Sequence, residues 1–430
     1  MYGGGLKTPS HDFVTGYTAV HVFTGRTPDP RARERRRPPW KEVYVSSPYA
    51  DTPRIDTLWL SEPDMIEAGV TDSAACVDTM EETLILLADG DYRMAGASAN
   101  SHGAQINFPK NPEHEGMPAD GPDRRFMAMP AYLGGRFRAA GVKWYGSNAE
   151  NRNHDLPRSI HIFVLNDAVT GAPLAMMSAN LLSAYRTGAV PGVGVKHLAV
   201  ENAEEVGIIG PGVMSRTIFD AALSQRPSIR RVKIKGRSAG STQRVAEWFT
   251  ETYPQLESVT VVDTEQEAIE NSDILIAGTS TSPDGPSGFP YFKKEWIKPG
   301  ALILCPAAAR FDEDFITSDE ANLVVDYTGL YAEWFNENGP DVTYEKLLGI
   351  PGNRWWDMSE EGILPKERLV NIGDIAAGRA PGRENDEQIF CYSIGGMPVE
   401  DVAWAWDVYH NALEKGLGTK LNLWDTPTLK

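Results

Sequence analysis

The sequence predicts an α/β protein in which a doubly wound parallel sheet is inserted into an α+β domain. Between residues 189 and 330, short apolar runs alternate with amphipathic stretches of helical length, which is typical of a parallel sheet wrapped by helices. Between residues 125 and 180, strand-like segments follow one another with only turns between them. This second pattern indicates an antiparallel or mixed sheet.

Individual elements follow from periodicity and end signals. A strand is expected at 57–60, and Ser-Glu-Pro-Asp at 61–64 opens a helix. Helical spacing over 77–89 stops at Gly90. The strand-rich part predicts strands at 125–133, 141–147, 159–167 and 174–179. The alternating part predicts strands starting near 205, 230, 258, 273, 301 and 322, with helices at 214–225, 241–253 and 265–271 between the first of them. Residues 399–418 begin with acidic residues and end in Lys and Gly, as a capped helix does.

Four segments are expected along the chain. Residues 1–55 are rich in Pro, Gly and charge and are interpreted as an extended arm, with the basic run at 31–37 as a solvated or intersubunit surface. Phosphate or anionic-substrate binding is the alternative for that run. Residues 56–188 and 331–430 are expected to form one domain in two parts, and residues 189–330 form the inserted domain.

Composition narrows the function classes. The chain has 430 residues, 41% of them hydrophobic and 23% charged, as in a globular protein of two domains. A formal net charge of −18 argues against nucleic acid and anionic membranes as partners. Three scattered cysteines and eight histidines show no ligand spacing, so no metal site is expected. We expect a cytoplasmic protein, because the sequence shows neither a signal-peptide pattern nor an apolar run near the ~18 residues of a membrane span.

A glycine-rich turn, V-G-I-I-G-P-G-V-M-S-R at 206–216, lies at the first strand-to-helix junction of the alternating part. It approximates the G-x-G-x-x-G/A pattern of Rossmann-type dinucleotide-binding domains. The first glycine permits a tight turn, the second lets a pyrophosphate approach the backbone, and a small third residue lets the helix pack against the strand. The predicted phosphate site therefore comprises Gly210, Pro211, Gly212, Val213, Met214 and Ser215, the last a mild departure from Gly or Ala.

The end of the second strand predicts the preferred nucleotide. An acidic residue there binds the ribose 2′-hydroxyl of NAD, whereas a cation and a hydroxyl suit the 2′-phosphate of NADP. This chain has Lys235, Gly236, Arg237 and Ser238 at that place. NADP(H) is therefore favoured over NAD(H), with Arg237 and Ser238 as contacts. The alternative is that Arg237 is a surface residue of a basic strand.

Three stretches together resemble the ornithine cyclodeaminase/mu-crystallin family. They are residues 141–190, with K-W-x-x-S, N-D-x-x-T-G-x-P-x-A and S-A-x-R-T, the glycine-rich turn, and residues 378–418. The resemblance covers about residues 57–420. Within the family, F-P-K, M-P-A-Y-L-G-G and the segment 141–159 look most like the branch that oxidises N-(amino-carboxyethyl)glutamate in diaminopropionate synthesis.

The resemblance implies an NAD(P)-dependent oxidoreductase that transfers a hydride at the α-carbon of an amino or imino acid, and a homodimer formed through the sheet of the substrate domain. By family position, Lys143 and Arg186 match the contacts to the substrate carboxylate. A guanidinium suits bidentate capture of a carboxylate, and Lys143 is also a candidate for proton transfer. Lys110 is a third candidate cation. The alternatives are a surface salt bridge for Lys143 and a structural ion pair for Arg186.

The same matching places other residues at the cofactor. Thr187 would reach the cofactor phosphates, and Thr279, Ser280 and Thr281 would lie beside the nicotinamide half. Ser393 and Gly395 match a segment that covers the nicotinamide, with an ordinary turn as the alternative.

One departure from the family pattern distinguishes between the possible reactions. Cyclodeaminases of the family carry a catalytic aspartate after the fifth strand, and here Ala308 occupies that position. Asp312 is a substitute only after a loop shift, so cyclodeamination is the weaker alternative. Arg310 adds a positive charge that would favour a substrate with a second carboxylate. A non-catalytic protein that binds NADPH and a small ligand, as mu-crystallin does, is the other alternative.

Overall fold

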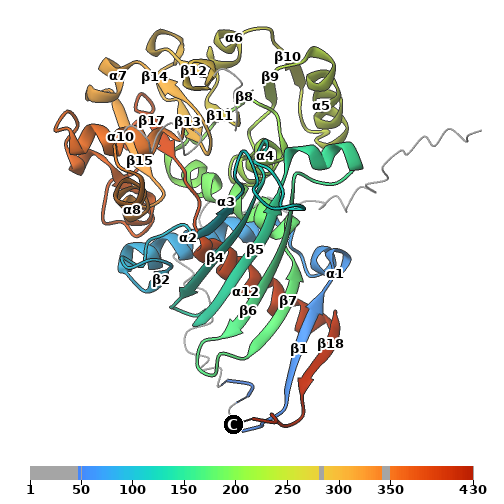
Figure 1. The fold of residues 1–430 in the computed structure, drawn as a ribbon. Helices are drawn as coiled ribbons and strands as arrows, with labels where there is room; N and C mark the ends of the chain where they lie inside the picture. Colours follow the sequence, from blue (N-terminus) through green and yellow to red (C-terminus); the bar gives the residue numbers. More distant parts are fainter. Residues whose placement is uncertain (1–46, 50, 280–284, 341–348, 430) are drawn as a thin grey trace, which may run out of the picture. The chain divides into compact units, whose positions relative to one another are not determined.

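The computed structural model describes residues 47–49, 51–279, 285–340 and 349–429. The predicted arm at 1–55 therefore lies almost wholly outside the described residues. Among the described residues there are two eight-stranded sheets, one mixed and one parallel, shown in Figure 1. The described residues form a single contact unit that holds both sheets.

The mixed sheet confirms the strands predicted in the first part of the chain. Its order is β18-β1-β7-β6-β5-β4-β2, with β3 paired to β4. Neighbouring strands are antiparallel except β1 and β7. The strands are β1 (Ile55–Leu60), β2 (Tyr92–Met94), β3 (Ala104–Asn107), β4 (Arg125–Leu133), β5 (Ala139–Ser147), β6 (Ser159–Asp167), β7 (Pro173–Ser178) and β18 (Thr419–Trp424).

Four helices pack with this sheet: α1 (Glu62–Glu67), α2 (Ser73–Asp89), α3 (Asn180–Leu198) and α12 (Pro398–Lys415). The predicted ends are confirmed. Ser61 caps α1, and α2 ends at Gly90, whose φ of 76° is left-handed. Helix α12 contacts β4, β5 and β6, so it covers the inner face of the sheet where every second side chain is buried.

The parallel sheet has the order β10-β9-β8-β11-β13-β17-β15-β16 (Figure 1). Its strands are β8 (Glu205–Ile209), β9 (Arg231–Lys235), β10 (Ser258–Val261), β11 (Ile274–Ala277), β13 (Leu302–Cys305), β15 (Ala321–Val325), β16 (Val370–Asn371) and β17 (Ile389–Ser393). The chain runs outward from β8 to β10 and then continues on the other side of β8 with β11. This reversal is the topological switch point beside which α/β proteins bind their ligands.

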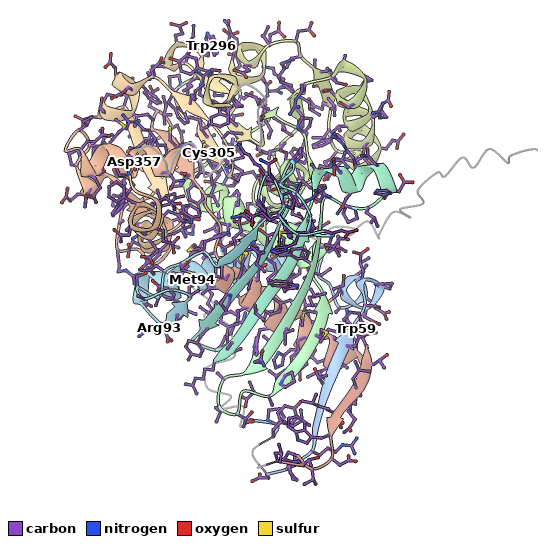
Figure 2. The ribbon with its side chains drawn as sticks, in the orientation of Figure 1. Trp59, Arg93, Met94, Trp296, Cys305 and Asp357 are labelled. Atoms are coloured by element: carbon purple, nitrogen blue, oxygen red, sulfur yellow. The ribbon has the colours of Figure 1, made fainter. Side chains whose placement is uncertain are left out.

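Seven helices accompany the parallel sheet within the described ranges. They are α4 (Val213–Gln225), α5 (Ala239–Thr252), α6 (Glu265–Ile269), α7 (Glu313–Thr317), α8 (Thr328–Asn338), α10 (Pro351–Glu360) and α11 (Ile372–Ala376). A two-stranded ribbon, β12 (Tyr291–Phe292) with β14 (Arg310–Phe311), lies outside the main sheet. Figure 2 labels Cys305 on β13 and Asp357 on α10 in this half of the chain.

The expected segment boundaries differ from the observed elements. The boundary at 188/189 falls inside α3, and the boundary at 330/331 falls inside α8. Beyond residue 331, β16 and β17 also pair in the parallel sheet, with β17 between β13 and β15. We therefore propose that the parallel-sheet unit extends from Ala199 to Gly396. Glycine and proline often end a helix, yet α3 continues through them. Gly188 allows α3 to lie close to α4, since a Cβ there would lie 2.5 Å from the Thr217 carbonyl carbon.

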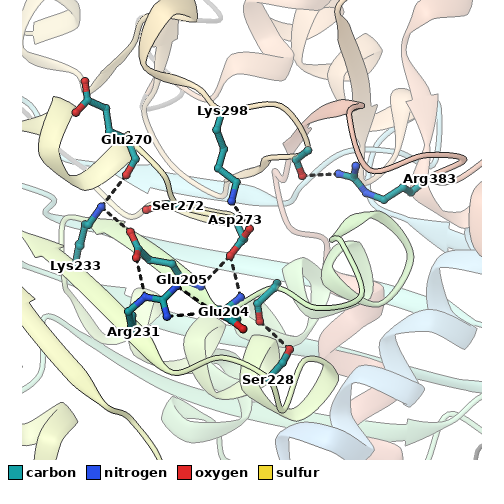
Figure 3. A network of polar contacts seen from close by, with 12 residues as sticks. Glu204, Glu205, Ser228, Arg231, Lys233, Glu270, Ser272, Asp273, Lys298 and Arg383 are labelled. Carbon is teal, nitrogen blue, oxygen red and sulfur yellow. Dashed lines mark hydrogen bonds and ion pairs between the residues drawn. The ribbon is translucent and has the colours of Figure 1, made fainter.

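Ion pairs hold the amino-terminal edge of the parallel sheet (Figure 3). Asp273 accepts hydrogen bonds from the backbone amides of Glu204 and Glu205, at 2.8 and 2.9 Å, and pairs with Lys298. Glu205 in turn pairs with Arg231 at 3.0 Å and with Lys233 at 2.5 Å. This network pairs the polar groups at the amino-terminal ends of the strands. It lies at the edge opposite the glycine-rich turn.

Candidate functional site

The glycine-rich turn joins β8 to α4 at the carboxyl edge of the parallel sheet. Gly210 has a φ of +84°, and a Cβ there would lie 2.7 Å from the Thr279 backbone nitrogen, so only glycine fits. A Cβ at Gly212 would meet no atom of the described residues within 4 Å, and Val213 is 66% exposed. No side chain in the described part of the chain caps α4. Its first amides therefore face open space at the positive end of the helix dipole.

Ser215 and Thr279 show how closely this turn is packed. The Ser215 hydroxyl donates to the Gly210 carbonyl at 2.7 Å and is buried. A Cβ at Gly278 would lie 1.9 Å from the same hydroxyl oxygen, so the helix approaches the sheet as closely as the small residue at 215 allows. Thr279 accepts a hydrogen bond from the Ala308 amide at 3.2 Å. Ser280 and Thr281, also predicted here, lie outside the described residues.

The segment after β9 is exposed and basic. Arg237 and Ser238 are exposed, and Ser238 is the N-terminal cap of α5, where its hydroxyl accepts from the Ser241 amide. No acidic residue occurs between Lys235 and Ser238. Arg237 and Ser238, the residues predicted to set the nucleotide preference, therefore lie at the carboxyl end of β9, which pairs with β8.

A buried cluster of four charges lies between the mixed sheet, α3 and α12. We call Lys143, Arg186, Glu400 and Asp401 the charged cluster; their exposures are 2%, 5%, 0% and 0%. Lys143 Nζ lies 2.9 Å from Asp401 Oδ2, and Arg186 Nε lies 3.0 Å from Asp401 Oδ1. Arg186 Nη1 lies 2.5 Å from Glu400 Oε2. The two predicted carboxylate-binding cations are thus brought together and share one aspartate.

The charged cluster meets the carboxyl edge of the parallel sheet at Gly395 and Gly396. Asp326, directly after β15, accepts hydrogen bonds from the amides of both glycines, at 2.7 and 2.9 Å. Gly396 has a φ of +72°, and a Cβ there would lie 3.1 Å from Arg186 Nη1. The turn that ends β17 therefore passes directly over the guanidinium, which joins the two halves of the site.

Burial and neighbouring charge shift the pKa values of this cluster. Burial, helped by the Arg186 charge and opposed by Asp401, lowers the pKa of Lys143 to about 8. Burial raises the pKa of Glu400 to about 7, although Arg186 opposes this. Burial alone would raise the pKa of Asp401, but Arg186 and Lys143 outweigh it and the pKa is lowered. Asp401 is therefore ionised at neutral pH, whereas Lys143 and Glu400 titrate close to it.

Two histidines border the charged cluster. The His102 ring lies 5.5 Å from the Trp334 ring, and burial together with the charges of Lys143 and Arg186 lowers its pKa to about 3. The His161 ring lies 4.7 Å from the Tyr145 ring, and burial and Lys143 lower its pKa to about 4. Both rings are neutral at physiological pH.

Three other residues were predicted to lie at the cofactor, namely Thr187, Ser393 and Gly395. Thr187 follows Arg186 in α3, next to the crossing of α3 and α4. Ser393 is buried, and its hydroxyl accepts hydrogen bonds from the Gly352 amide at 2.8 Å and the Tyr331 hydroxyl at 3.3 Å. A Cβ at Gly395 would lie 2.6 Å from Leu330 Cδ2, so α8 requires glycine there.

The other two predicted substrate cations do not join the charged cluster. Lys110 is exposed just after β3. Arg310 lines a cavity of about 610 Å³ beside α7 and α10, together with Trp355 and Asp357. Its Nε donates to the Phe289 carbonyl at 3.1 Å, and its guanidinium lies 5.1 Å from the Tyr291 ring. The proposed contacts of Lys110 and Arg310 with a substrate stay predictions.

The comparison with protein families decides which family this is. The model of the ornithine cyclodeaminase/mu-crystallin family matches residues 70–416. This chain belongs to the ornithine cyclodeaminase/mu-crystallin family. It is 28% identical over 372 residues to N-((2S)-2-amino-2-carboxyethyl)-L-glutamate dehydrogenase of Staphylococcus aureus, which covers 86% of this chain and 99% of the relative.

Solved structures agree with the family assignment. One is the Δ1-pyrroline-2-carboxylate reductase of Thermococcus litoralis in complex with NADH and L-proline, with a TM-score of 0.66, 26% identity, and coverage of 85% of this chain and 100% of the other. Another is an archaeal alanine dehydrogenase dimer with bound NAD, with a TM-score of 0.66, 27% identity, and coverage of 86% and 100%. These likenesses confirm the predicted fold of an ornithine cyclodeaminase/mu-crystallin family member.

Glu400 and Asp401 are the residues of the site that sequence reasoning missed. Both were interpreted only as the acidic start of a helix, where carboxylates are common for their interaction with the dipole. A second signal was present, because the residues that follow them in α12 are apolar and the helix is buried from its first turn. Carboxylates in such a turn need cationic partners.

Proposed function

We propose that this chain is an NAD(P)-dependent oxidoreductase that transfers a hydride between a nicotinamide and the α-carbon of an amino or imino acid. The observation that carries the proposal is the buried pair of Lys143 and Arg186 directly beneath the glycines that end β17. Cations buried at the carboxyl edge of a doubly wound sheet suit a small carboxylate next to a dinucleotide. The family relatives named as reductases and dehydrogenases of such acids support the same reading.

The described residues fit a dinucleotide. Gly210 and Gly212 leave the backbone open, and the uncapped start of α4 offers amides to a pyrophosphate. Thr279 follows β11 and Gly395 follows β17, the two strands on either side of β13, and we assign the nicotinamide half to that side. When bound, the nicotinamide supplies or accepts the hydride.

The residues of the chain then have distinct tasks. Arg186 and Lys143 bind the substrate carboxylate and so orient the α-carbon. Imine reduction also consumes one proton, and the Lys143 ammonium, with a pKa of about 8, holds one at neutral pH. Trp334 and the turn at Gly395 cover the site and exclude water.

We propose NADP(H) as the preferred nucleotide. The support is the exposed basic segment after β9, which contains Arg237 and Ser238 and has no carboxylate to bind a 2′-hydroxyl. R237A is expected to weaken NADPH binding by about tenfold or more, the loss of roughly 1.4 kcal/mol or more, and to leave NADH binding nearly unchanged. Equal losses for both nucleotides would reject this preference.

We propose a homodimer formed through the outer face of the mixed sheet. In the single chain this face exposes Phe126 at 40%, Trp144 at 39% and Ile160 at 49%. The Phe126 and Trp144 rings stack at 5.8 Å. Apolar clusters of this kind are typical of interfaces, and the archaeal alanine dehydrogenase is a dimer. Light scattering is expected to give a dimer for the native chain and a monomer or a weakened dimer for W144E.

Turnover separates the enzyme from the alternatives. With NADPH and a panel of cyclic and secondary imino acids, the native chain is expected to oxidise the nucleotide in proportion to product. A binding protein would bind NADPH without consuming it, and a cyclodeaminase would release ammonia with catalytic nucleotide. Cyclodeamination is further disfavoured because Ala308 is buried at the family's aspartate position and Asp312 accepts hydrogen bonds from Tyr291 and the Lys294 amide.

A further inference from the structure

Within the charged cluster, one carboxylate differs from the other. Asp401 uses both oxygens, one for Lys143 and one for Arg186. Glu400 uses only Oε2, and its Oε1 is buried without a hydrogen-bond partner among the described residues. A buried carboxylate with an unpartnered oxygen is costly when it is ionised. Glu400 is therefore the member of the cluster whose charge is least well supported.

The charges of the cluster balance only while it holds no ligand. Lys143 and Arg186 carry two positive charges, and Glu400 and Asp401 carry two negative charges when ionised. A substrate carboxylate would add a third negative charge to a site whose members are at most 5% exposed. Three carboxylates beside two cations in such a place do not all remain ionised, so one of them takes a proton.

The geometry identifies the carboxylate that takes the proton. Arg186 presents Nε to Asp401 and Nη1 to Glu400, and no described residue accepts from its Nη2. Bidentate capture of a second carboxylate through Nη1 and Nη2 brings that carboxylate against Glu400. A Cβ at Gly396 would lie 3.1 Å from Nη1, so the glycine avoids placing a side chain against the guanidinium on this side.

We infer that Glu400 is the proton-accepting counter-ion of the carboxylate site: it pairs with Arg186 in the free protein and takes up one proton from solvent when the substrate carboxylate binds. This inference rests on the proposed function and names the residue that sets the affinity of the site. Glu400 is a positioning residue in this account, because it acts on the substrate through Arg186.

The surroundings of Glu400 agree with this role. The charged and titratable groups that face it are Arg186 on α3, Lys143 on β5, Asp401 on α12, Asp326 after β15, Tyr392 on β17 and Cys76 on α2. Two of these are cations and two are carboxylates. Burial raises the pKa of Glu400 to about 7 in the free protein, so the proton is exchanged within the physiological range.

The test measures proton uptake directly. Pyrrole-2-carboxylate is a planar carboxylate without a titrating amine, and it is added to the NADPH-saturated protein at pH 7.5 in two buffers of different ionisation enthalpy. We expect uptake of about one proton per ligand in the native protein and well under half a proton in E400Q, where Lys143 alone contributes. Between pH 7 and pH 8 the Kd of the native protein is expected to rise about tenfold, while that of E400Q rises at most about twofold.

E205Q is the matched control. Glu205 is a buried glutamate in an ion-paired network at the opposite edge of the parallel sheet (Figure 3). Its amide variant is expected to keep the native proton uptake. A purely structural role for Glu400 would lower the affinity of E400Q equally at every pH, and that result overturns the inference.

The other possible results of this experiment also test the inference. Binding of pyrrole-2-carboxylate without proton uptake by the native protein overturns this inference and leaves the carboxylate site intact. Absence of binding at any pH overturns both this inference and the proposed carboxylate site. If E400Q does not fold, infrared difference spectra of the native protein replace it. The appearance of a protonated carboxyl band on binding supports the inference, and its absence overturns it.

Discussion

Replacing Asp401 by Asn removes one charge from the charged cluster and keeps the shape of the side chain. Asp401 holds Lys143 and Arg186 with separate oxygens at 2.9 and 3.0 Å. An amide retains one acceptor, so one of the two buried cations is left facing N–H donors. Removal of a buried carboxylate saves its desolvation energy, but two adjacent cations then lose their shared partner. The second effect is the larger one, and breaking a buried ion pair in this way costs about 3–5 kcal/mol.

D401N is therefore expected to lose about 3–5 kcal/mol in the free energy of unfolding, measured by urea denaturation. Its KM for an imino-acid substrate is expected to rise at least about tenfold, equivalent to about 1.4 kcal/mol, because Lys143 and Arg186 lose their common orientation.

D407N on the same helix is the control. Asp407 pairs with Arg136 at 2.5 Å, but solvent reaches both side chains, which are 20% and 22% exposed. Its expected loss is about 1–2 kcal/mol, with KM unchanged. Equal losses in the two variants, or an unchanged KM in D401N, would refute the assignment of Asp401 as the group that positions both cations.

Three further predictions follow from the same geometry. G210A is expected to weaken NADPH binding at least about tenfold in a fluorescence titration, the equivalent of about 1.4 kcal/mol, because its Cβ would lie 2.7 Å from the Thr279 nitrogen; native affinity would contradict the proposed phosphate turn. KM is expected to rise as pH increases through about 8, since the ammonium of Lys143 is present below its pKa of about 8 and lost above it; a KM that falls over that range would contradict the role of Lys143. D326N is expected to lose about 2–4 kcal/mol in unfolding free energy, because its amide leaves a buried backbone N–H unpaired and removes two charge-assisted bonds to the glycines after β17; stability within ~0.5 kcal/mol of native would contradict the account of that turn.

Structural features that depend on a short stretch of sequence were predicted correctly. The turn around Gly210 needs a left-handed backbone conformation, which dictates glycine at that position, and the strands β4, β5 and β6 show their alternation directly. Helix α12 was predicted with its cap at Gly416. In each of these cases the local sequence and the final fold require the same residues.

Features that depend on distant residues were not predictable in this way. Strand β17 lies between β13 and β15, and its short apolar run gives no indication of that position. Helix α3 contains Gly188 and Pro191, which resemble a break, yet the small residues allow it to be buried against α4. The pairing of Glu400 with Arg186 joins residues 214 positions apart, so the sequence showed the cation and the carboxylate but not the contact.

The fate of the nicotinamide hydride tests the central claim most directly. The native chain is incubated with NADPH carrying deuterium at C4 and with an imino acid that it reduces, and the amino-acid product is examined by NMR. The account predicts deuterium on the α-carbon, in amounts equal to the nucleotide oxidised. Product whose α-hydrogen comes from solvent, or NADPH that stays bound and unoxidised across the whole imino-acid panel, would contradict it.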